Sequence, residues 1–137
     1  MFEKSIRVLI LDDMYSRAIE FEKRLKAIDV TDITHVTTAR ECIECLSKKK
    51  YDIIFLDYDL GEPPVWAKDT DVSGGVVAEW IKKHPKHKNK KAMIIIHSSD
   101  LHGAAYMKEL IADAILLPGA WSEEKFEKIK IPAFETV

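Results

Sequence analysis

Three short, almost entirely apolar runs recur 40 to 45 residues apart, and each leads into ionisable or polar side chains. The runs and the side chains that follow them are 8–11 with Asp12 and Asp13, 53–56 with Asp57 and Asp59, and 93–96 with His97, Ser98 and Asp100. Continuous apolar runs of this length are typical of parallel strands that are buried on both faces. Ligands of such sheets bind beyond the carboxyl ends of the strands. The pattern therefore predicts one site assembled from three strand ends.

Apolar runs alternate with amphipathic stretches along the whole chain. The expected strands are 6–11, 33–36, 52–56, 92–97 and 113–117, and the expected helices are 15–28, 38–48, 74–84, 103–111 and 122–130. Thr38 followed by Glu41 predicts a capping box at the start of the second helix, and Ser73 is expected to cap the third. Regular alternation predicts an α/β fold with a doubly wound five-stranded parallel sheet, in the strand order 2-1-3-4-5.

Length and composition narrow the class of protein. A chain of 137 residues fits a single domain, 1–137. The net charge of −2 gives no overall attraction to nucleic acid or to an anionic membrane. No apolar stretch reaches the ~18 residues of a membrane span, and the N-terminal apolar run is too short for a signal peptide. We therefore expect a cytoplasmic protein without a membrane partner.

The clustered carboxylates need a partner of opposite charge. Two carboxylates about 4 Å apart repel by roughly 4 kcal/mol at an effective dielectric constant near 20. Side chains two residues apart in a strand share a face, so Asp57 and Asp59 are expected to point the same way. Either some of the acids bind protons or a hard cation such as Mg²⁺ or Mn²⁺ lies among them. The alternative is that Asp12 and Asp13 cap the first helix and Asp57 begins a turn.

His97 and Ser98 add chemistry at the end of the fourth strand. Neighbouring carboxylates would favour the protonated form of His97 and would suit it to act as a general acid. The Ser98 hydroxyl could bind a phosphate oxygen. The alternative for His97 is a hydrogen-bonded residue at the boundary of the core.

Several segments together resemble a known family. They are LDD at 11–13, Arg17, LDYDLG at 56–61, SG at 73–74, IIIHSSDLHGAAYM at 94–107 and LP at 117–118. This set resembles the response-regulator receiver fold and, within it, the cyclic-phosphate processing receiver domain family, over about residues 6–120. The resemblance implies a divalent-metal-dependent site for a phosphoryl group, on a small molecule or a nucleic-acid end. It implies Mg²⁺ or Mn²⁺ held by Asp12, Asp13 and Asp57, catalysis by Asp57, His97 and Asp59, and substrate contacts from Ser98, Arg17 and Asp100.

The sequence departs from the family pattern at three positions. Tyr58 and Asp100 stand where the family usually has His and Asn, and Gly119 stands where Phe is usual. Compared with phosphoacceptor receivers, Leu117 replaces Lys and His97 takes the place of Thr or Ser. The alternative to an enzyme is a non-enzymatic receiver-like module for signalling or interaction, although the missing Lys argues against ordinary phosphorylation switching.

Two further segments have open interpretations. The lysine-rich run 82–91 precedes the fourth strand, at the end of the sheet opposite the acidic residues, and could attract nucleic acid. A solvated loop is the favoured interpretation, because charge runs usually are solvated. The irregular stretch 60–72 contains Pro63 and Pro64 and could form a lid with Trp66 as a stacking surface, or an ordinary surface loop.

Overall fold

Five strands and five helices alternate along the chain in the computed structural model, which describes residues 5–61 and 73–129. The elements are β1 (Arg7–Leu11), α1 (Tyr15–Ala27), β2 (Asp32–Val36), α2 (Ala39–Lys48), β3 (Ile53–Leu56), α3 (Gly75–Lys83), β4 (Met93–Ile96), α4 (Leu101–Leu110), β5 (Ile115–Leu116) and α5 (Glu123–Phe126). The proposed lid with Trp66 lies outside the described residues.

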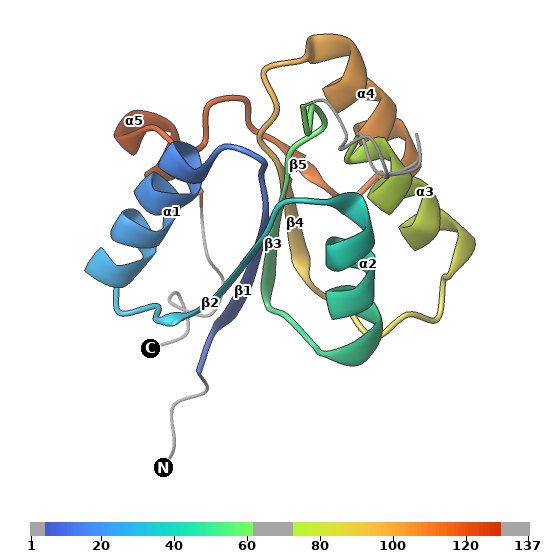
Figure 1. The fold of residues 1–137 in the computed structure, drawn as a ribbon, viewed down its shortest axis with the longest axis horizontal. Coiled ribbons are helices and arrows are strands. Elements are labelled where there is room, and N and C mark those ends of the chain that lie inside the picture. The colour runs from blue at the N-terminus through green and yellow to red at the C-terminus, as the bar shows by residue number, and fades with distance from the viewer. Residues whose placement is uncertain (1–4, 62–72, 130–137) are drawn as a thin grey trace.

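All five strands are parallel, and their order in the sheet is β2-β1-β3-β4-β5. The fold class and strand order predicted from the sequence are therefore confirmed. The register aligns Leu11 with Leu56, and Leu56 with Ile96, so that β1, β3 and β4 end at the same level. Figure 1 shows these three ends meeting at the upper edge of the sheet. This alignment is what gathers the side chains that follow each strand.

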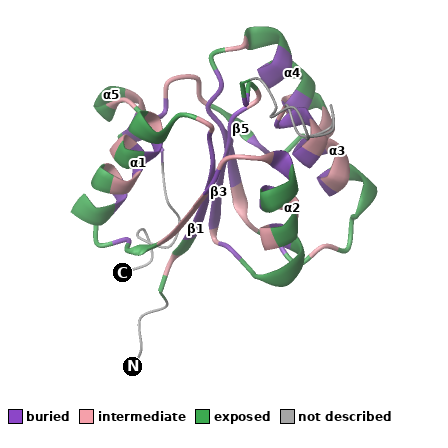
Figure 2. Ribbon diagram, in the orientation of Figure 1, coloured by how far each residue is buried: buried purple, intermediate pink, exposed green. Residues whose placement is uncertain are grey.

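Helices cover both faces of the sheet, with α1 and α5 on one side and α2, α3 and α4 on the other (Figure 1). Strand residues alternate between the two resulting cores. Leu9, Leu11, Ile54 and Ile96 pack with α2, α3 and α4, whereas Val8, Ile10, Phe55 and Ile95 pack with α1 and α5. The central strands are buried on both sides (Figure 2), which is why their sequences are almost wholly apolar.

Polar side chains fix where the helices begin. Thr38 accepts a hydrogen bond from the Glu41 N–H at 3.2 Å, and its hydroxyl donates to the Glu41 carboxylate at 3.0 Å, which confirms the predicted capping pair. Asp100 accepts from the Gly103 N–H at 2.9 Å, so that α4 begins at Leu101, two residues earlier than predicted. Ser73 is not the N-cap of α3. Gly74 occupies that position, and the Ser73 hydroxyl accepts from the Gly75 N–H.

The last helix is shorter than the sequence pattern indicated. Ser122 caps it as expected, accepting a hydrogen bond from the Lys125 N–H, but α5 ends at Phe126. Within residues 5–61 and 73–129, no helix has the length and apolar character needed to cross a membrane.

Candidate metal and phosphate site

Backbone hydrogen bonds between neighbouring strands continue one residue beyond β1, β3 and β4. They fix the positions of the first polar residue after each of these strands. The N–H groups of Asp12, Asp57 and His97 donate to the carbonyls of Val36, Leu11 and Leu56 respectively, each at 3.1 Å. These three residues therefore lie side by side on adjacent strands. The apolar runs that precede them fix their backbones in the core.

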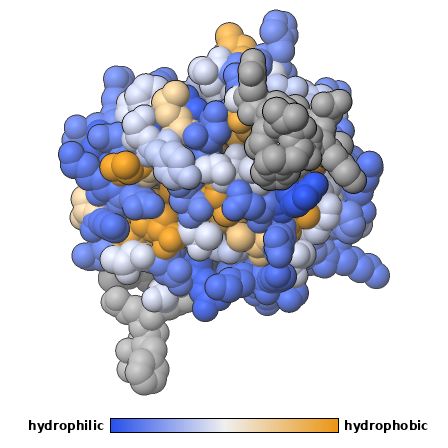
Figure 3. Space-filling model, viewed as in Figure 1, coloured by the Kyte–Doolittle hydropathy of each residue, from blue (hydrophilic) through white to orange (hydrophobic). Residues whose placement is uncertain are grey.

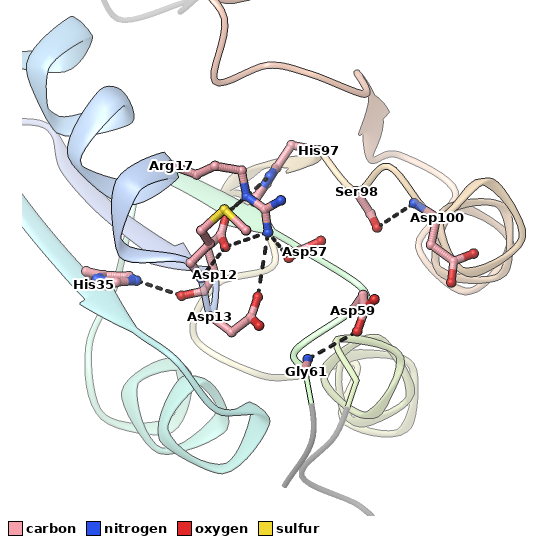
Figure 4. Close-up of polar contacts among 11 residues, drawn as sticks. Asp12, Asp13, Arg17, His35, Asp57, Asp59, Gly61, His97, Ser98 and Asp100 are labelled. Carbon is pink, nitrogen blue, oxygen red and sulfur yellow. Dashed lines mark hydrogen bonds and ion pairs between the residues drawn. The ribbon is translucent and has the colours of Figure 1, made fainter.

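Asp12, Asp13 and Asp57 form a cluster in which one carboxylate oxygen from each residue lies within 4.8 Å of the others. Asp12 is fully buried, Asp57 is 3% exposed and Asp13 is half-buried at the rim. Figure 4 shows the three carboxylates converging at the end of the sheet. The structure thus brings together the three residues that the sequence predicted as metal ligands.

Arg17 places a guanidinium group among these carboxylates. Its Nε donates to Asp12 Oδ2 and its Nη2 to Asp12 Oδ1, both at 2.9 Å. The same Nη2 lies 3.0 Å from Asp57 Oδ2 and 3.6 Å from Asp13 Oδ1. The bonds to Asp12 raise the pKa of Arg17 above its ordinary value. Arg17 was predicted to contact substrate, whereas here it binds the acidic cluster, so that a cation of the chain itself offsets part of the repulsion.

Asp57 is a carboxyl group that gains a proton readily. Burial and the nearby Asp12 charge raise its pKa from 3.8 to about 7, although Arg17 and the Ser98 hydroxyl act in the opposite direction. Burial and Asp12 also raise the pKa of Asp13. In this structure the cluster therefore carries less negative charge near neutral pH than three ordinary aspartates would.

Ser98, not His97, supplies the hydroxyl beside Asp57. The buried Ser98 hydroxyl lowers the pKa of Asp57, and its oxygen accepts a hydrogen bond from the Asp100 N–H at 3.1 Å. The correspondence of His97 to the Thr or Ser of phosphoacceptor receivers stays a prediction. Alternate residues point to opposite faces at a strand end, so His97 turns to the α1 side.

His97 is buried against aromatic rings. Its ring lies 4.9 Å from that of Phe21 and 6.2 Å from that of Phe55, and its Nδ1 is 3.9 Å from Asp12 Oδ2. Burial lowers the pKa of His97 to about 4, and this outweighs the attraction of Asp12. The expectation of a protonated His97 is wrong. Burial destabilises the charged imidazolium by more than the attraction of the single neighbouring carboxylate, Asp12, stabilises it.

Asp59 and Asp100 have contacts other than those expected. β3 ends at Leu56, and the chain turns so that Asp59 is exposed, with its Oδ1 accepting from the Gly61 N–H at 3.1 Å. Asp57 and Asp59 therefore do not extend the strand as a pair on one face (Figure 4). Asp100 caps α4. The catalytic role of Asp59 and the substrate contact of Asp100 stay predictions.

Two hydrogen bonds of Asp12 at this site were not predicted from the sequence. The His35 Nε2 donates to the backbone carbonyl of Asp12 at 2.7 Å and steadies the turn after β1. Asp12 Oδ1 also accepts from the Met14 N–H at 2.8 Å, so Asp12 shapes the entry to α1 as well as facing the cluster. The alternation within β2 could have placed His35 beside β1, but nothing in the sequence marked its bond to Asp12.

The donor set fits a hard divalent cation. Carboxylate oxygens are the ligands that Mg²⁺ prefers, and three are within reach of one another. Gly61 has φ of 72°, and a Cβ at this position would lie 2.8 Å from Asp13 Oδ2. A side chain there would crowd the open side of the Asp13 carboxylate, so the glycine keeps it accessible.

The parallel sheet of order 2-1-3-4-5, with an acidic cluster beyond its central strands, defines a receiver-like α/β protein. Residues 7–113 match the family Cyclic-phosphate processing Receiver domain, and the chain belongs to this family. The resemblance inferred from the sequence motifs is thereby confirmed.

Solved structures show the same fold. One is a response regulator protein from Burkholderia pseudomallei with a phosphorylated aspartic acid, calcium ion and citrate (17% identity, TM-score 0.67, 96% of this chain and 70% of that chain). Two are CheY-like response regulator receiver domains. The one from Methanospirillum hungatei has 20% identity and TM-score 0.64, covering 96% of each chain. The one from Methylobacillus flagellatus has 19% identity and TM-score 0.63, covering 97% of this chain and 95% of that chain. No curated protein matches the sequence.

Proposed function

We propose that this protein is a divalent-metal-dependent phosphoesterase that opens a cyclic phosphate on a nucleotide or an RNA end. The observation that carries the proposal is the cluster of Asp12, Asp13 and Asp57 at the carboxyl edge of the sheet, in a chain of the Cyclic-phosphate processing Receiver domain family. Asp12, Asp13 and Asp57 would hold Mg²⁺, and Mn²⁺ suits the same oxygen donors. A bound divalent ion would neutralise phosphate oxygens and acidify water.

The residues of the chain have separate tasks in this proposal. In the hydrolysis, a water oxygen bonds to phosphorus, one ester P–O bond breaks, and a proton passes to the leaving alkoxide to give a phosphomonoester. Arg17, once a metal ion balances the carboxylates, would be free to bind a phosphate oxygen through its planar guanidinium. The Ser98 hydroxyl would bind a second oxygen, and Asp59, exposed at the rim, would orient the attacking water.

His97 is the residue whose proposed role changes most. A buried imidazole that is neutral at pH 7 is poorly placed to donate a proton to substrate, and its Nδ1 faces Asp12. We therefore assign His97 a positioning role through Asp12. A loss of turnover in His97→Ala with retained metal binding would support this role.

The second candidate function is signalling through phosphorylation of Asp57. The observation that favours it is the buried Asp57 carboxylate beside the Ser98 hydroxyl, together with the phosphorylated aspartic acid in the similar Burkholderia protein. Against it stands Leu117, which cannot supply the charge of the Lys in phosphoacceptor receivers.

One pair of assays separates the two functions. Purified protein is incubated with 2′,3′-cyclic and 3′,5′-cyclic nucleotides, cyclic oligonucleotides and RNA ending in a cyclic phosphate, with Mg²⁺, Mn²⁺ or EDTA. We expect metal-dependent formation of a phosphomonoester that Asp57→Asn abolishes and that the exposed, distant Asp113→Asn leaves unchanged. Intact-mass measurement after acetyl phosphate treatment is the counter-test. A persistent phosphoryl adduct on Asp57, with no turnover of any cyclic substrate, would overturn the enzyme and favour the signalling module.

A further inference from the structure

Two lysine-rich segments meet at the end of the sheet opposite the acidic cluster. Lysine occupies all three positions of 48–50 and six of the ten positions of 82–91. The first segment ends α2 and the second joins α3 to β4, so both lie where the strands begin (Figure 1). Hydrophilic side chains line the lower right edge of the molecule in Figure 3, where Figure 1 places these segments. We call residues 48–50 and 82–91 together the basic end.

A buried asparagine fastens the two segments to each other. Asn89 is 2% exposed, and its Oδ1 accepts from the Tyr51 N–H at 2.6 Å. Its Nδ2 donates to the carbonyls of Leu46 at 3.0 Å and Lys49 at 2.8 Å. The lysine-rich run is therefore not a freely moving loop, because three hydrogen bonds from one side chain hold it against the end of α2. The lysines are presented on a fixed frame, which the sequence alone did not indicate.

An aromatic pocket opens within this basic end. It has a volume of about 420 Å³ and is lined by Trp80, His84, Pro85 and His87, with Lys86 and Lys88 among its other lining residues. The Trp80 and His84 rings are stacked, with centroids 4.6 Å apart, and the His87 ring lies 5.8 Å from Trp80. The volume falls within the range of about 300–1,000 Å³ that is usual for small-ligand pockets.

The two histidines present opposite hydrogen-bonding groups. His84 Nδ1 lies 2.7 Å from the Trp80 carbonyl, which can only accept, so the proton of the neutral ring is on Nδ1 and Nε2 is an acceptor. His87 Nδ1 accepts from the Asn89 N–H at 3.1 Å, so its proton is on Nε2. The pocket is thus lined by the Trp80 ring and by two imidazoles whose neutral forms are opposite tautomers.

We propose that the basic end binds single-stranded nucleic acid, with lysines against the phosphates and a base in the aromatic pocket. Sequence-tolerant single-strand binding sites combine a positively charged track with aromatic rings on which bases stack, and both parts are present here. A polyanion without bases would match the lysines but would leave the aromatic pocket without a partner. Glu44 pairs with Lys48 at 2.8 Å, so that the charge comes mainly from 82–91. This site is distinct from the acidic cluster and does not depend on its activity.

The test measures binding of a fluorescent, unstructured single strand of about ten nucleotides, within the span of known single-strand sites. We expect Lys86, Lys88, Lys90 and Lys91→Gln to weaken binding and to reduce the slope of log K against log salt by up to about 3, since each phosphate contact contributes ~0.7. The matched control replaces Lys23, Lys26, Lys125 and Lys128 with Gln on α1 and near α5, with the same change of charge. The control should bind as the wild type does, and melting temperatures verify folding.

A second measurement locates the base. The oligonucleotide should quench tryptophan fluorescence in the wild type, and Trp80→Phe should bind with similar affinity while losing most of the quenching. Trp80→Leu should weaken binding at least about fivefold. Equal binding by both lysine variants, unchanged quenching in Trp80→Phe, or binding of duplex DNA or inorganic polyphosphate as tight as that of the single strand would each overturn the proposal.

Discussion

Arg17 supplies positive charge to a cluster of three aspartates that would otherwise need a bound cation. Its two nitrogens contact both oxygens of Asp12 and one of Asp57 within 3.0 Å. Each unit charge at about 4 Å is worth roughly 4 kcal/mol at an effective dielectric constant of 20. A divalent ion bound as proposed would therefore compete with the guanidinium for the same carboxylate oxygens.

The first prediction follows from this competition. In metal-free protein, Arg17→Gln should lower the melting temperature and should tighten Mg²⁺ binding about tenfold, since the metal no longer displaces a bound guanidinium. Isothermal titration calorimetry in protein freed of metal gives the affinity. Arg24→Gln is the matched control, because Arg24 lies on the same helix and pairs with Glu20 at 3.4 Å, away from the cluster. Weaker Mg²⁺ binding in Arg17→Gln would show that Arg17 orients the ligands and does not compete.

His97 provides the second prediction at the residue scale. Burial against Phe21 and Phe55 lowers its pKa to about 4, so the ring should be neutral throughout pH 5–8. Its Nε2 has no hydrogen-bond partner among the described residues. NMR titration of the His97 ring in metal-free protein measures this directly, with His102 on α4 as an internal reference. A midpoint above pH 6 would restore the general-acid role expected from the sequence.

At the scale of elements, two glycines let helices approach the end of β3. A Cβ on Gly74 would clash with the Asp57 carbonyl, and a Cβ on Gly103 would clash with the Tyr58 ring. Tyr58 is half-buried and packs against the core formed with α2, α3 and α4. The large Tyr58 side chain and the missing Gly103 side chain are therefore complementary.

The third prediction tests this complementarity by a double-mutant cycle. Gly103→Ala alone should lower the free energy of unfolding by about 1–3 kcal/mol through overpacking. In a Tyr58→Ala background the same change should be neutral, or stabilising by up to about 1 kcal/mol, because alanine favours a helix interior over glycine. Urea unfolding of the four proteins gives the coupling energy. Additive effects would show that Gly103 and Tyr58 are not packed as described.

At the scale of the whole molecule, the two ends of the sheet differ in charge. Acidic residues gather where β1, β3 and β4 end, and the basic end lies where the strands begin. A net charge of −2 conceals this separation. The proposed metal and phosphate site and the proposed nucleic-acid site would thus lie at opposite ends of the sheet.

The pH dependence of stability is the fourth prediction. The pKa of Asp57 rises from 3.8 to about 7 on folding, so between these values the folded state binds a proton that the unfolded state does not. The contribution of Asp57 to stability is complete below pH 4 and is lost as pH rises to about 7. His97 acts oppositely, because its pKa falls from 6.5 to about 4 on folding, so that its contribution grows with pH between these values.

Asp57→Asn should separate these two contributions. In EDTA, the free energy of unfolding of the variant minus that of the wild type should increase with pH between about 4 and 7, by up to about 1.4 kcal/mol per pH unit. Urea unfolding at intervals across this range measures the difference, with Asp113→Asn as the control of equal charge change. A difference that does not vary with pH would contradict the raised pKa of Asp57.

The fold class, the strand order and the edge of the sheet at which Asp12, Asp13 and Asp57 gather could all be predicted from the amino-acid sequence. These features follow from local patterns: apolar runs that only a doubly covered strand can bury, helical spacing between them, and polar residues at strand ends. The motifs also led to the correct family. The capping role of Thr38 could be predicted because a helix cap involves only residues that are neighbours in the sequence.

The contacts and the protonation of the individual side chains follow from the folded chain and could not be predicted from local patterns. Arg17 binds the carboxylates, and the pKa of His97 is lowered so that its ring is neutral at pH 7. Ser98 acts on the pKa of Asp57, and Asp59 is bound to the Gly61 N–H outside the cluster of three aspartates. Each outcome depends on the exact residue at which a strand ends and on how much water the surrounding elements exclude. Asn89 likewise joined two lysine runs about 40 positions apart through hydrogen bonds that no local pattern encodes. Burial and long-range contacts are properties of the packed chain, and they set protonation and partner choice there.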